Sequence, residues 1–248
     1  MDIVENIYRY NETRRLNKTN RRERGALSLT ESIRRVNLSG KIAIIAEYKR
    51  RSPSGFIMAG NYSVLGYLGG IKNERIAGYS VLTEEKYFSG SFDDVRIAHQ
   101  LNMPILAKDF ISNELMIDAA YCAGSDCILL ISDFLSREKL IALSDYARSK
   151  GLDVLVEFHS PGEIPKVLSV KGAIIGYNRR NLRTMGMEPE ESEILPKLSA
   201  SNSLLVLESG LDSKNLKSID LKRFNALLIG TSMLNGEHVG EVLDGMGI

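Results

Sequence analysis

Charged and amide side chains stand at the ends of five apolar runs in this 248-residue sequence. Each run is short and rich in Ile, Val or Leu, and each ends on a group that can carry a proton, form an ion pair or make hydrogen bonds. These groups are Glu47, Lys49, Lys108, Glu157, Asn178 and Glu208. Lysines and carboxylates held together out of water shift each other's pKa, so a proton donor and a proton acceptor can coexist at neutral pH. The residue types indicate general acid–base chemistry if the fold brings them together.

A second set of residues is suited to binding phosphate. The segments 208–213 (ESGLDS) and 229–234 (IGTSML) combine glycines, whose backbone N–H groups can approach an anion, with hydroxyl side chains. The loop 49–56 (KRRSPSGF) adds further hydroxyls, although it could also be an ordinary surface turn stiffened by Pro53. The candidate phosphate ligands are Ser52, Ser54, Ser209, Gly210, Gly230, Thr231 and Ser232.

Apolar residues end or follow four of the runs. They are Phe88, Phe110, Ile131 and Leu182. Each alone could simply anchor a loop. Together, opposite a phosphate site, they predict a slot for a flat apolar group. The expected ligand therefore carries a phosphate at one end and an aromatic ring at the other.

The elements that would position these residues repeat along the chain. Eight runs are predicted to be buried strands: 41–48, 79–83, 104–108, 126–131, 152–157, 173–178, 204–208 and 226–230. Amphipathic segments lie between them, of which 114–123 and 136–150 are the clearest and are followed by Gly124 and Gly151. Eight such units predict an α/β fold, a (β/α)8 TIM barrel, with a doubly wound open sheet as the alternative. In a barrel the alternation of side chains would direct Glu47 or Lys49, together with Lys108, Glu157 and Glu208, into one inner layer at the carboxyl ends of the strands.

Residues 1–40 lie outside the repeat and carry nine basic and five acidic residues. We expect a helical extension that caps the barrel, so that 1–40 and the eight units of 41–248 form one domain. A basic arm that binds RNA is the alternative, but residues 11–40, which carry eight of the nine basic residues, have no interleaved aromatic residue suited to base stacking. The segment 65–71 (LGYLGGI) is unusually rich in glycine for the helix expected there.

The composition excludes several classes of protein. The formal net charge is +1, so nothing in it requires a nucleic-acid partner. The apolar runs are far shorter than the ~20 residues of a membrane span, and the N-terminus has no apolar signal core, so we expect a cytoplasmic protein without a membrane partner. Two cysteines and three scattered histidines predict neither a disulfide framework nor a metal site. We expect a monomer.

Six segments, in this order and spacing, resemble indole-3-glycerol phosphate synthase, and its archaeal branch most closely. They are 46–55 (AEYKRRSPSG), 80–91 (SVLTEEKYFSGS), 104–111 (PILAKDFI), 174–182 (IIGYNRRNL), 208–210 (ESG) and 228–234 (LIGTSML). The resemblance runs from about residue 30 to the C-terminus. It implies a TIM barrel that works without metal or organic cofactor. It also implies ring closure, decarboxylation and dehydration of 1-(2-carboxyphenylamino)-1-deoxyribulose 5-phosphate in tryptophan biosynthesis.

The resemblance also implies roles for the catalytic candidates. Lys108 resembles the general acid that assists ring closure, and Glu157 resembles its partner in dehydration. Lys49 would pair with the substrate carboxylate or share proton donation. Glu47 and Glu208 would orient the lysines and the substrate hydroxyls, and Asn178 would hydrogen-bond the substrate.

Matching positions imply the binding residues. Ser52, Ser209, Gly210, Gly230 and Thr231 fall where the family binds phosphate, and Arg180 matches an arginine near the site. The slot for the anthranilate ring would be formed by Phe88, Phe110, Ile131 and Leu182.

The sequence departs from the family after the sixth run. The family form G-x-N-N-R-D-L is here GYNRRNL, with Arg179 in place of a small polar residue and Asn181 in place of aspartate. The exchange removes one negative charge and adds one positive charge. It bears on any ion pair that would anchor Arg180, and not on the central chemistry.

Two other classes of function remain open at this point. One is a neighbouring barrel enzyme, such as phosphoribosylanthranilate isomerase or a Schiff-base aldolase that uses Lys108, because fold alone does not decide function. The first run lacks the Cys/Asp acid–base pair that is expected of an isomerase of that type. The other is a module that binds sugar phosphate or RNA without catalysis.

Overall fold

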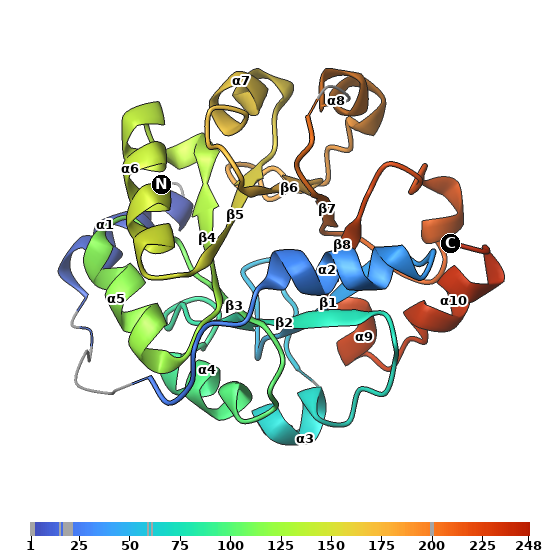
Figure 1. The fold of residues 1–248 in the computed structure, drawn as a ribbon, viewed down its shortest axis with the longest axis horizontal. Helices are drawn as coiled ribbons and strands as arrows, with labels where there is room; N and C mark the ends of the chain where they lie inside the picture. Colours follow the sequence, from blue (N-terminus) through green and yellow to red (C-terminus); the bar gives the residue numbers. More distant parts are fainter. Residues whose placement is uncertain (1–2, 15, 17–21, 59, 61, 199–200) are drawn as a thin grey trace.

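Eight parallel strands close in chain order into a barrel (Figure 1). The computed structural model describes residues 3–14, 16, 22–58, 60, 62–198 and 201–248. The strands are β1 (Ala43–Tyr48), β2 (Ile76–Leu82), β3 (Ile105–Lys108), β4 (Cys127–Ile131), β5 (Asp153–Phe158), β6 (Ile174–Asn178), β7 (Leu205–Glu208) and β8 (Ala226–Ile229). The TIM-barrel prediction is confirmed. The open sheet is excluded because β1 pairs with β8.

Helices follow the strands and surround the barrel (Figure 1), except that the connection from β7 to β8 has only a 3₁₀ turn among its described elements. They are α3 (Val64–Leu68), α4 (Phe92–His99), α5 (Glu114–Ala123), α6 (Arg137–Ser149), α7 (Ile164–Val167), α8 (Glu191–Leu198), α9 (Thr231–Leu234) and α10 (Val239–Gly245). Short 3₁₀ turns are η1 (Ser132–Phe134), η2 (Pro161–Glu163) and η3 (Leu216–Ser218). In the described residues, no helix has the length and apolar character needed to cross a membrane.

Local sequence explains where several helices begin and end. The Asn113 side chain accepts a hydrogen bond from the Met116 amide at the start of α5, and Gly124 ends that helix with φ +99°. Ser136 caps α6 in the same way through the Lys139 amide. The glycine-rich segment 65–71 forms only a short helix that stops at Leu68.

Strand β2 begins at Ile76, three residues before the predicted run. Gly78 interrupts the apolar pattern there, and a Cβ atom on it would collide with the Pro104 carbonyl and the Leu29 side chain. The glycine that hides the strand in the sequence therefore permits close packing in the fold.

Alternate residues of the strands form two separate apolar layers. Outward-facing residues pack against the helices, whereas inward-facing ones such as Ile45, Leu106, Leu155 and Val206 fill the barrel. Glu47, Lys108, Glu157 and Glu208 continue these inward faces by the strand alternation, which places them at the top of the barrel core.

The N-terminal extension contains α1 (Ile3–Thr13) and α2 (Leu29–Leu38). Helix α1 reaches the carboxyl end of β3, where Asn11 donates a hydrogen bond to the Phe110 carbonyl. Helix α2 lies across the amino ends of the strands (Figure 1), where the Thr30 amide donates to Asp153 at the start of β5. The extension thus contacts both ends of the barrel.

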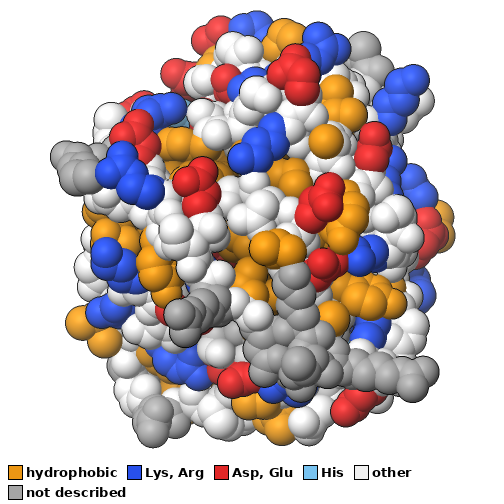
Figure 2. All heavy atoms as spheres, turned by 90° about the vertical axis from the view of Figure 1, so that its left-hand side faces the viewer, with side chains coloured by type: hydrophobic (Ala, Val, Ile, Leu, Met, Phe, Trp, Pro, Cys, Tyr) orange, Lys and Arg blue, Asp and Glu red, His pale blue; other side chains and the backbone are white. Residues whose placement is uncertain are grey.

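Part of the basic charge of this extension is used in ion pairs with the barrel. Arg14 pairs with Asp109, and Arg22 and Arg24 pair with Asp126. The basic residues at positions 15, 18 and 21 lie outside the described residues. On the face shown in Figure 2, Lys and Arg side chains are interspersed with Asp and Glu rather than gathered into a basic stripe.

Candidate active site

A cavity of about 620 Å³ opens at the carboxyl ends of the strands. It is lined by every candidate residue from the sequence except Glu208, which lies beneath it in contact with Lys108. The candidates that line it are Glu47, Lys49, Ser52, Phe88, Lys108, Phe110, Ile131, Glu157, Asn178, Arg180, Leu182, Ser209, Gly210, Gly230 and Thr231. The fold therefore gathers residues from all eight βα units around one cavity, with polar side chains from six of them and only apolar residues from the second and the fourth.

Lys108 lies at the centre of three carboxylates. Its Nζ is 2.8 Å from Glu208 Oε2, 3.5 Å from Glu47 Oε2 and 3.8 Å from Glu157 Oε2. Lys49 Nζ lies 2.6 Å from Glu47 Oε1. The five charged groups that the sequence directs into one layer are thus in contact.

Two glycines make room for this cluster. A Cβ atom at Gly176 of β6 would collide with Glu208 Oε1, and one at Gly230 after β8 would collide with Glu47 Oε1. Neighbouring strands therefore carry glycine where each of these carboxylates turns inward.

The cluster holds groups in different protonation states. Burial acts to lower the pKa of Lys108, but the carboxylates of Glu208, Glu47 and Glu157 outweigh it and raise that pKa above its usual value. Burial raises the pKa of Glu208 to about 8, partly opposed by Lys108. Glu47 is also buried, yet Lys49 and Lys108 lower its pKa below the usual value. Lys108 therefore keeps its proton beside the ionised Glu47, and burial favours a proton on Glu208.

Asn178 holds Glu157 in place. Its Nδ2 donates to Glu157 Oε1 at 2.8 Å, and its Oδ1 accepts from the Arg180 amide at 2.9 Å. The other oxygen of Glu157, Oε2, and Oε1 of Glu208 are buried without a hydrogen-bond partner among the described residues. Such oxygens are costly to bury unless a ligand or water satisfies them.

The phosphate candidates follow three strands that are neighbours in the barrel, β7, β8 and β1. Ser209 and Gly210 are consecutive left-handed residues, with φ of +69° and +63°, so the backbone turns sharply after β7. Ser52 lies in the loop after β1, with its Oγ 2.9 Å from that of Ser54. The Ser232 hydroxyl is used differently from the expectation, because it donates to the Leu211 carbonyl at 2.8 Å.

Three of the apolar candidates, Phe88, Phe110 and Ile131, follow or end the neighbouring strands β2, β3 and β4, and β3 and β4 lie across the closed barrel from β7 and β8. The rings of Phe88 and Phe110 lie 6.1 Å apart, and Ile131 and Leu182 line the same cavity. Tyr8 of α1 packs edge-on against Phe110 at 5.9 Å. Sequence reasoning assigned Tyr8 no role, because no local pattern connects α1 with a residue about a hundred positions away.

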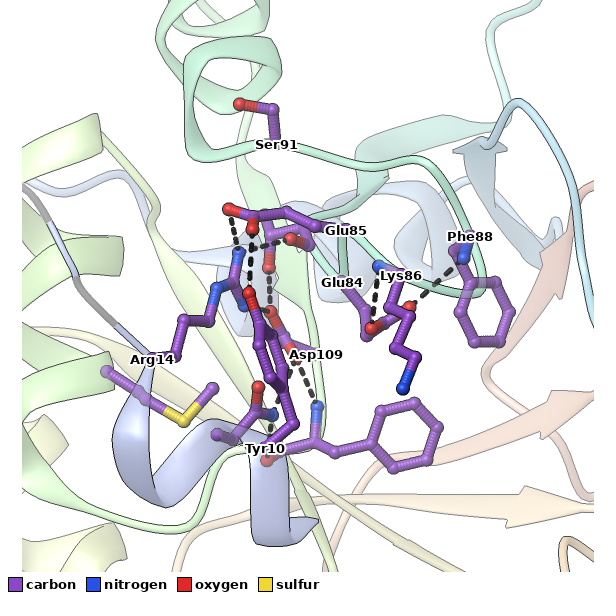
Figure 3. A network of polar contacts seen from close by, with 12 residues as sticks. Tyr10, Arg14, Glu84, Glu85, Lys86, Phe88, Ser91 and Asp109 are labelled. Carbon is purple, nitrogen blue, oxygen red and sulfur yellow. Dashed lines mark hydrogen bonds and ion pairs between the residues drawn. The ribbon is translucent and has the colours of Figure 1, made fainter. Parts of the chain in front are cut away.

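A network of buried polar contacts beside the ring slot was also missed (Figure 3). Arg14 Nη1 lies 2.7 Å from Asp109 Oδ2, and Thr83 Oγ1 donates to the same oxygen at 2.7 Å. Asp109 follows Lys108 directly and lies within the KDF segment, which was the available signal. The network ties α1 to the ends of β2 and β3.

The residues that depart from the family, Arg179 and Asn181, both pair with glutamates of the segment that follows β6. Arg179 pairs with Glu191 at 2.6 Å, and Asn181 Nδ2 donates to Glu188 Oε2 at 2.9 Å. Arg180 lines the cavity and donates from Nη1 to the Met185 carbonyl at 2.7 Å. Arg180 is therefore held by a backbone carbonyl.

Comparison with known proteins identifies the family. The family model for indole-3-glycerol phosphate synthase matches residues 2–245. The chain belongs to the indole-3-glycerol phosphate synthase family. It is 45% identical over 237 residues to that enzyme of Picrophilus torridus, covering 96% of this chain and 94% of the relative. It is 41% identical to that of Thermoplasma volcanium, covering 98% of both chains. The archaeal resemblance is thus confirmed.

Solved structures support the fold. The crystal structure of 3-hexulose-6-phosphate synthase from Salmonella typhimurium matches with a TM-score of 0.64 at 9% identity, over 83% of this chain and 97% of that one. The tryptophan synthase α subunit from Legionella pneumophila matches with a TM-score of 0.59 at 12% identity, over 88% and 94%. At these identities the likeness concerns the barrel alone.

Within the described residues, no three His, Cys, Asp or Glu side chains are arranged to hold a metal ion. The polar groups of this indole-3-glycerol phosphate synthase site are instead arranged around an amine, Lys108. Acid–base catalysis by side chains is the chemistry that this arrangement supports best.

Proposed function

We propose that this chain converts 1-(2-carboxyphenylamino)-1-deoxyribulose 5-phosphate into indole-3-glycerol phosphate. Membership of the indole-3-glycerol phosphate synthase family supports this reaction. One observation carries the assignment of roles. Lys108 lies among three carboxylates, between an aromatic slot and the phosphate candidates. A substrate with a ring at one end and a phosphate at the other would place its ketose carbons over this lysine.

In the first step, the ring carbon that bears the carboxylate attacks the C2 carbonyl of the ketose. Lys108 donates a proton to the developing alkoxide. It can supply this proton because its amine is charged and faces the cavity. Loss of carbon dioxide then leaves its electron pair in the ring and restores aromaticity. Lys49 would pair with the carboxylate before it leaves.

In the second step, the new hydroxyl leaves as water. An acid protonates that hydroxyl while a base removes a proton from the ring system, and Glu157 acts in this pair. Glu47 and Glu208 orient the lysines and the substrate hydroxyls. Asn178, which donates to Glu157, keeps that carboxylate aimed at the cavity and hydrogen-bonds the substrate.

Binding would be divided between the two ends of the cavity. Ser52, Ser209, Gly210, Gly230 and Thr231 would hold the phosphate. Arg180 would lie near the substrate. The aromatic ring would bind in the slot formed by Phe88, Phe110, Ile131 and Leu182.

We also propose that residues 1–248 form one domain that acts as a monomer in the cytoplasm. All the residues proposed for catalysis and binding come from one chain, and the extension of residues 1–40 packs on the barrel of 41–248. Light scattering on the purified protein is expected to give the mass of one chain. A larger mass would contradict the monomer.

Indole fluorescence tests the proposed reaction. The chain contains no Trp, so indole emission that appears on adding the substrate is seen against Tyr alone. Emission is expected to rise with time for the wild type and for a matched control, Lys150→Ala directly after α6, and not for Lys108→Ala. Absence of emission from the wild type, with inorganic phosphate still bound, would contradict the reaction and leave the phosphate site intact.

A further inference from the structure

The carboxylate of Glu84 binds the backbone of the turn that follows it (Figure 3). Glu84 is fully buried two residues after the end of β2. Its Oε1 accepts from the Lys86 amide at 2.9 Å, and its Oε2 accepts from the amides of Tyr87 at 2.7 Å and Phe88 at 3.0 Å. Burial raises the pKa of Glu84, and these three amides oppose the rise. One side chain thus fixes three consecutive peptide units.

The same turn is closed at its far end. The Gly90 amide donates to the Glu84 carbonyl at 2.8 Å, and Ser89 adopts a left-handed φ of +54°. A Cβ atom at Gly90 would collide with the Leu82 carbonyl. Residues 84–90 therefore form a compact unit whose shape depends on the buried carboxylate.

The turn contacts both ends of the candidate active site. On its inner side Phe88 lines the cavity and faces Phe110. On its outer side the Ser89 carbonyl accepts from Arg50 Nη1 at 2.9 Å, and the Lys86 carbonyl accepts from Arg51. These arginines directly precede Ser52, a phosphate candidate. Displacement of the turn would therefore move the ring slot and loosen the loop at the phosphate end together.

We propose that Glu84 is a positioning residue that couples the ring slot to the phosphate end through the turn 84–90. Glu84 does not line the cavity, so it acts on a ligand only through Phe88 and through the loop that carries Ser52. This inference rests on the proposed function for the identity of the two ligand ends. It goes beyond that function in assigning the control of both ends to one buried carboxylate.

The Glu84→Gln variant removes the charge and keeps the shape. A glutamine has one acceptor oxygen, and its amide nitrogen would face a backbone N–H, so at least one of the three hydrogen bonds is lost. We expect KM for the substrate to rise about tenfold, since small displacements of positioning groups have large kinetic effects. The dissociation constants of 2-aminobenzoate and of inorganic phosphate, measured separately by titration calorimetry, should both rise.

Two further variants separate this coupling from a loss of stability. Phe88→Leu should weaken 2-aminobenzoate only. Glu85→Gln, the same change at the next residue, should alter neither constant, because Glu85 faces Arg14 and Tyr10. All titrations are made well below the melting temperature of each variant.

The outcomes are distinct. Unchanged affinities in Glu84→Gln, with only a lower melting temperature, would overturn the proposal, as would weaker binding of one ligand alone. Failure of the wild type to bind either ligand would remove the two ends that the proposal connects. Normal binding by the wild type without indole formation would refute the proposed reaction, while the titrations would still decide the role of Glu84.

Discussion

Two buried clusters of opposite charges lie at opposite ends of the barrel. At the amino ends of the strands, Asp126 accepts from Arg24 at 2.9 and 3.0 Å, from Arg22 at 2.5 Å, and from the amides of Leu27 and Ile105. At the carboxyl ends, Lys108 lies among three carboxylates. We call the cluster around Asp126 the lower cluster and the cluster around Lys108 the upper cluster. Both clusters are withdrawn from water, and both join segments far apart in the sequence.

The clusters differ in how completely their polar atoms are satisfied. Both oxygens of Asp126 have more than one donor, and the N-terminal extension closes this cluster, although Nε of Arg24 is buried there without a hydrogen-bond partner among the described residues. In the upper cluster, Glu157 Oε2 and Glu208 Oε1 accept no hydrogen bond from the described residues, although Glu157 Oε2 lies 3.8 Å from Lys108 Nζ, and the cluster borders a cavity. Carboxylate oxygens that already accept several hydrogen bonds rigidify a structure, whereas buried carboxylate oxygens without a donor beside a cavity are left ready for a ligand. The lower cluster is thus suited to stability and the upper one to catalysis.

The largest expected effect comes from breaking the upper cluster. Lys108→Ala removes the group proposed to protonate the alkoxide, and turnover should fall by about 10²–10⁴-fold. The free energy of unfolding should change less than for the lower cluster, because water from the cavity can reach the remaining carboxylates. Indole emission and urea denaturation measure the two quantities. Turnover near that of the wild type would refute the role of Lys108.

Breaking the lower cluster should have the reverse effect. Asp126→Asn leaves Arg22 and Arg24 without a counter-charge in a buried position, which typically destabilises a protein by about 3–5 kcal/mol. Turnover of the folded variant at low temperature should remain close to that of the wild type. Asp145→Asn on the exposed face of α6 is the matched control. A loss of turnover without a loss of stability would contradict the division between the two ends.

The upper cluster was predictable from the sequence for a physical reason. Strand alternation and the closure of a parallel barrel dictate where the end of each run points, so Lys108, Glu157 and Glu208 could be placed together from local pattern. The lower cluster and the contacts of Arg14 with Asp109 depend on how the extension folds back over the barrel. Arg14 gives no local signal for a partner 95 residues away. The same holds for Tyr8 beside Phe110.

Protonation of Glu208 makes the contribution of the upper cluster to stability depend on pH. Burial raises its pKa from 4.5 to about 8. Between these values the native state holds a proton that the unfolded chain has released, so this contribution to stability is present below pH 4.5 and is lost as pH rises through about 8. The melting temperature of the wild type relative to Glu208→Gln should therefore fall from pH 5 to pH 9. A difference that stays constant with pH would contradict the raised pKa.

The smallest expected effect concerns the rim of the cavity, by which we mean the loop 179–188 after β6, where Asn181 and Glu188 pair near the solvent. Asn181 donates to Glu188, and this hydrogen bond is the first cause of the lowered pKa of that glutamate. Asn181→Asp restores the family residue but sets a second carboxylate against Glu188. We expect a slightly lower melting temperature and a change in KM of about twofold, since exposed charges are screened by water.

Asn181→Ala separates the lost donor from the added charge, because it removes the hydrogen bond without adding a carboxylate. A lower KM in Asn181→Asp than in Asn181→Ala would show that Arg180 leaves the Met185 carbonyl and pairs with the new carboxylate. The family's aspartate would then act here through Arg180, and the loop after β6 would affect the substrate, as the upper cluster is proposed to do. An equal KM in both variants would show that the contacts of Arg179, Arg180 and Asn181 in this loop stabilise the surface without affecting the substrate.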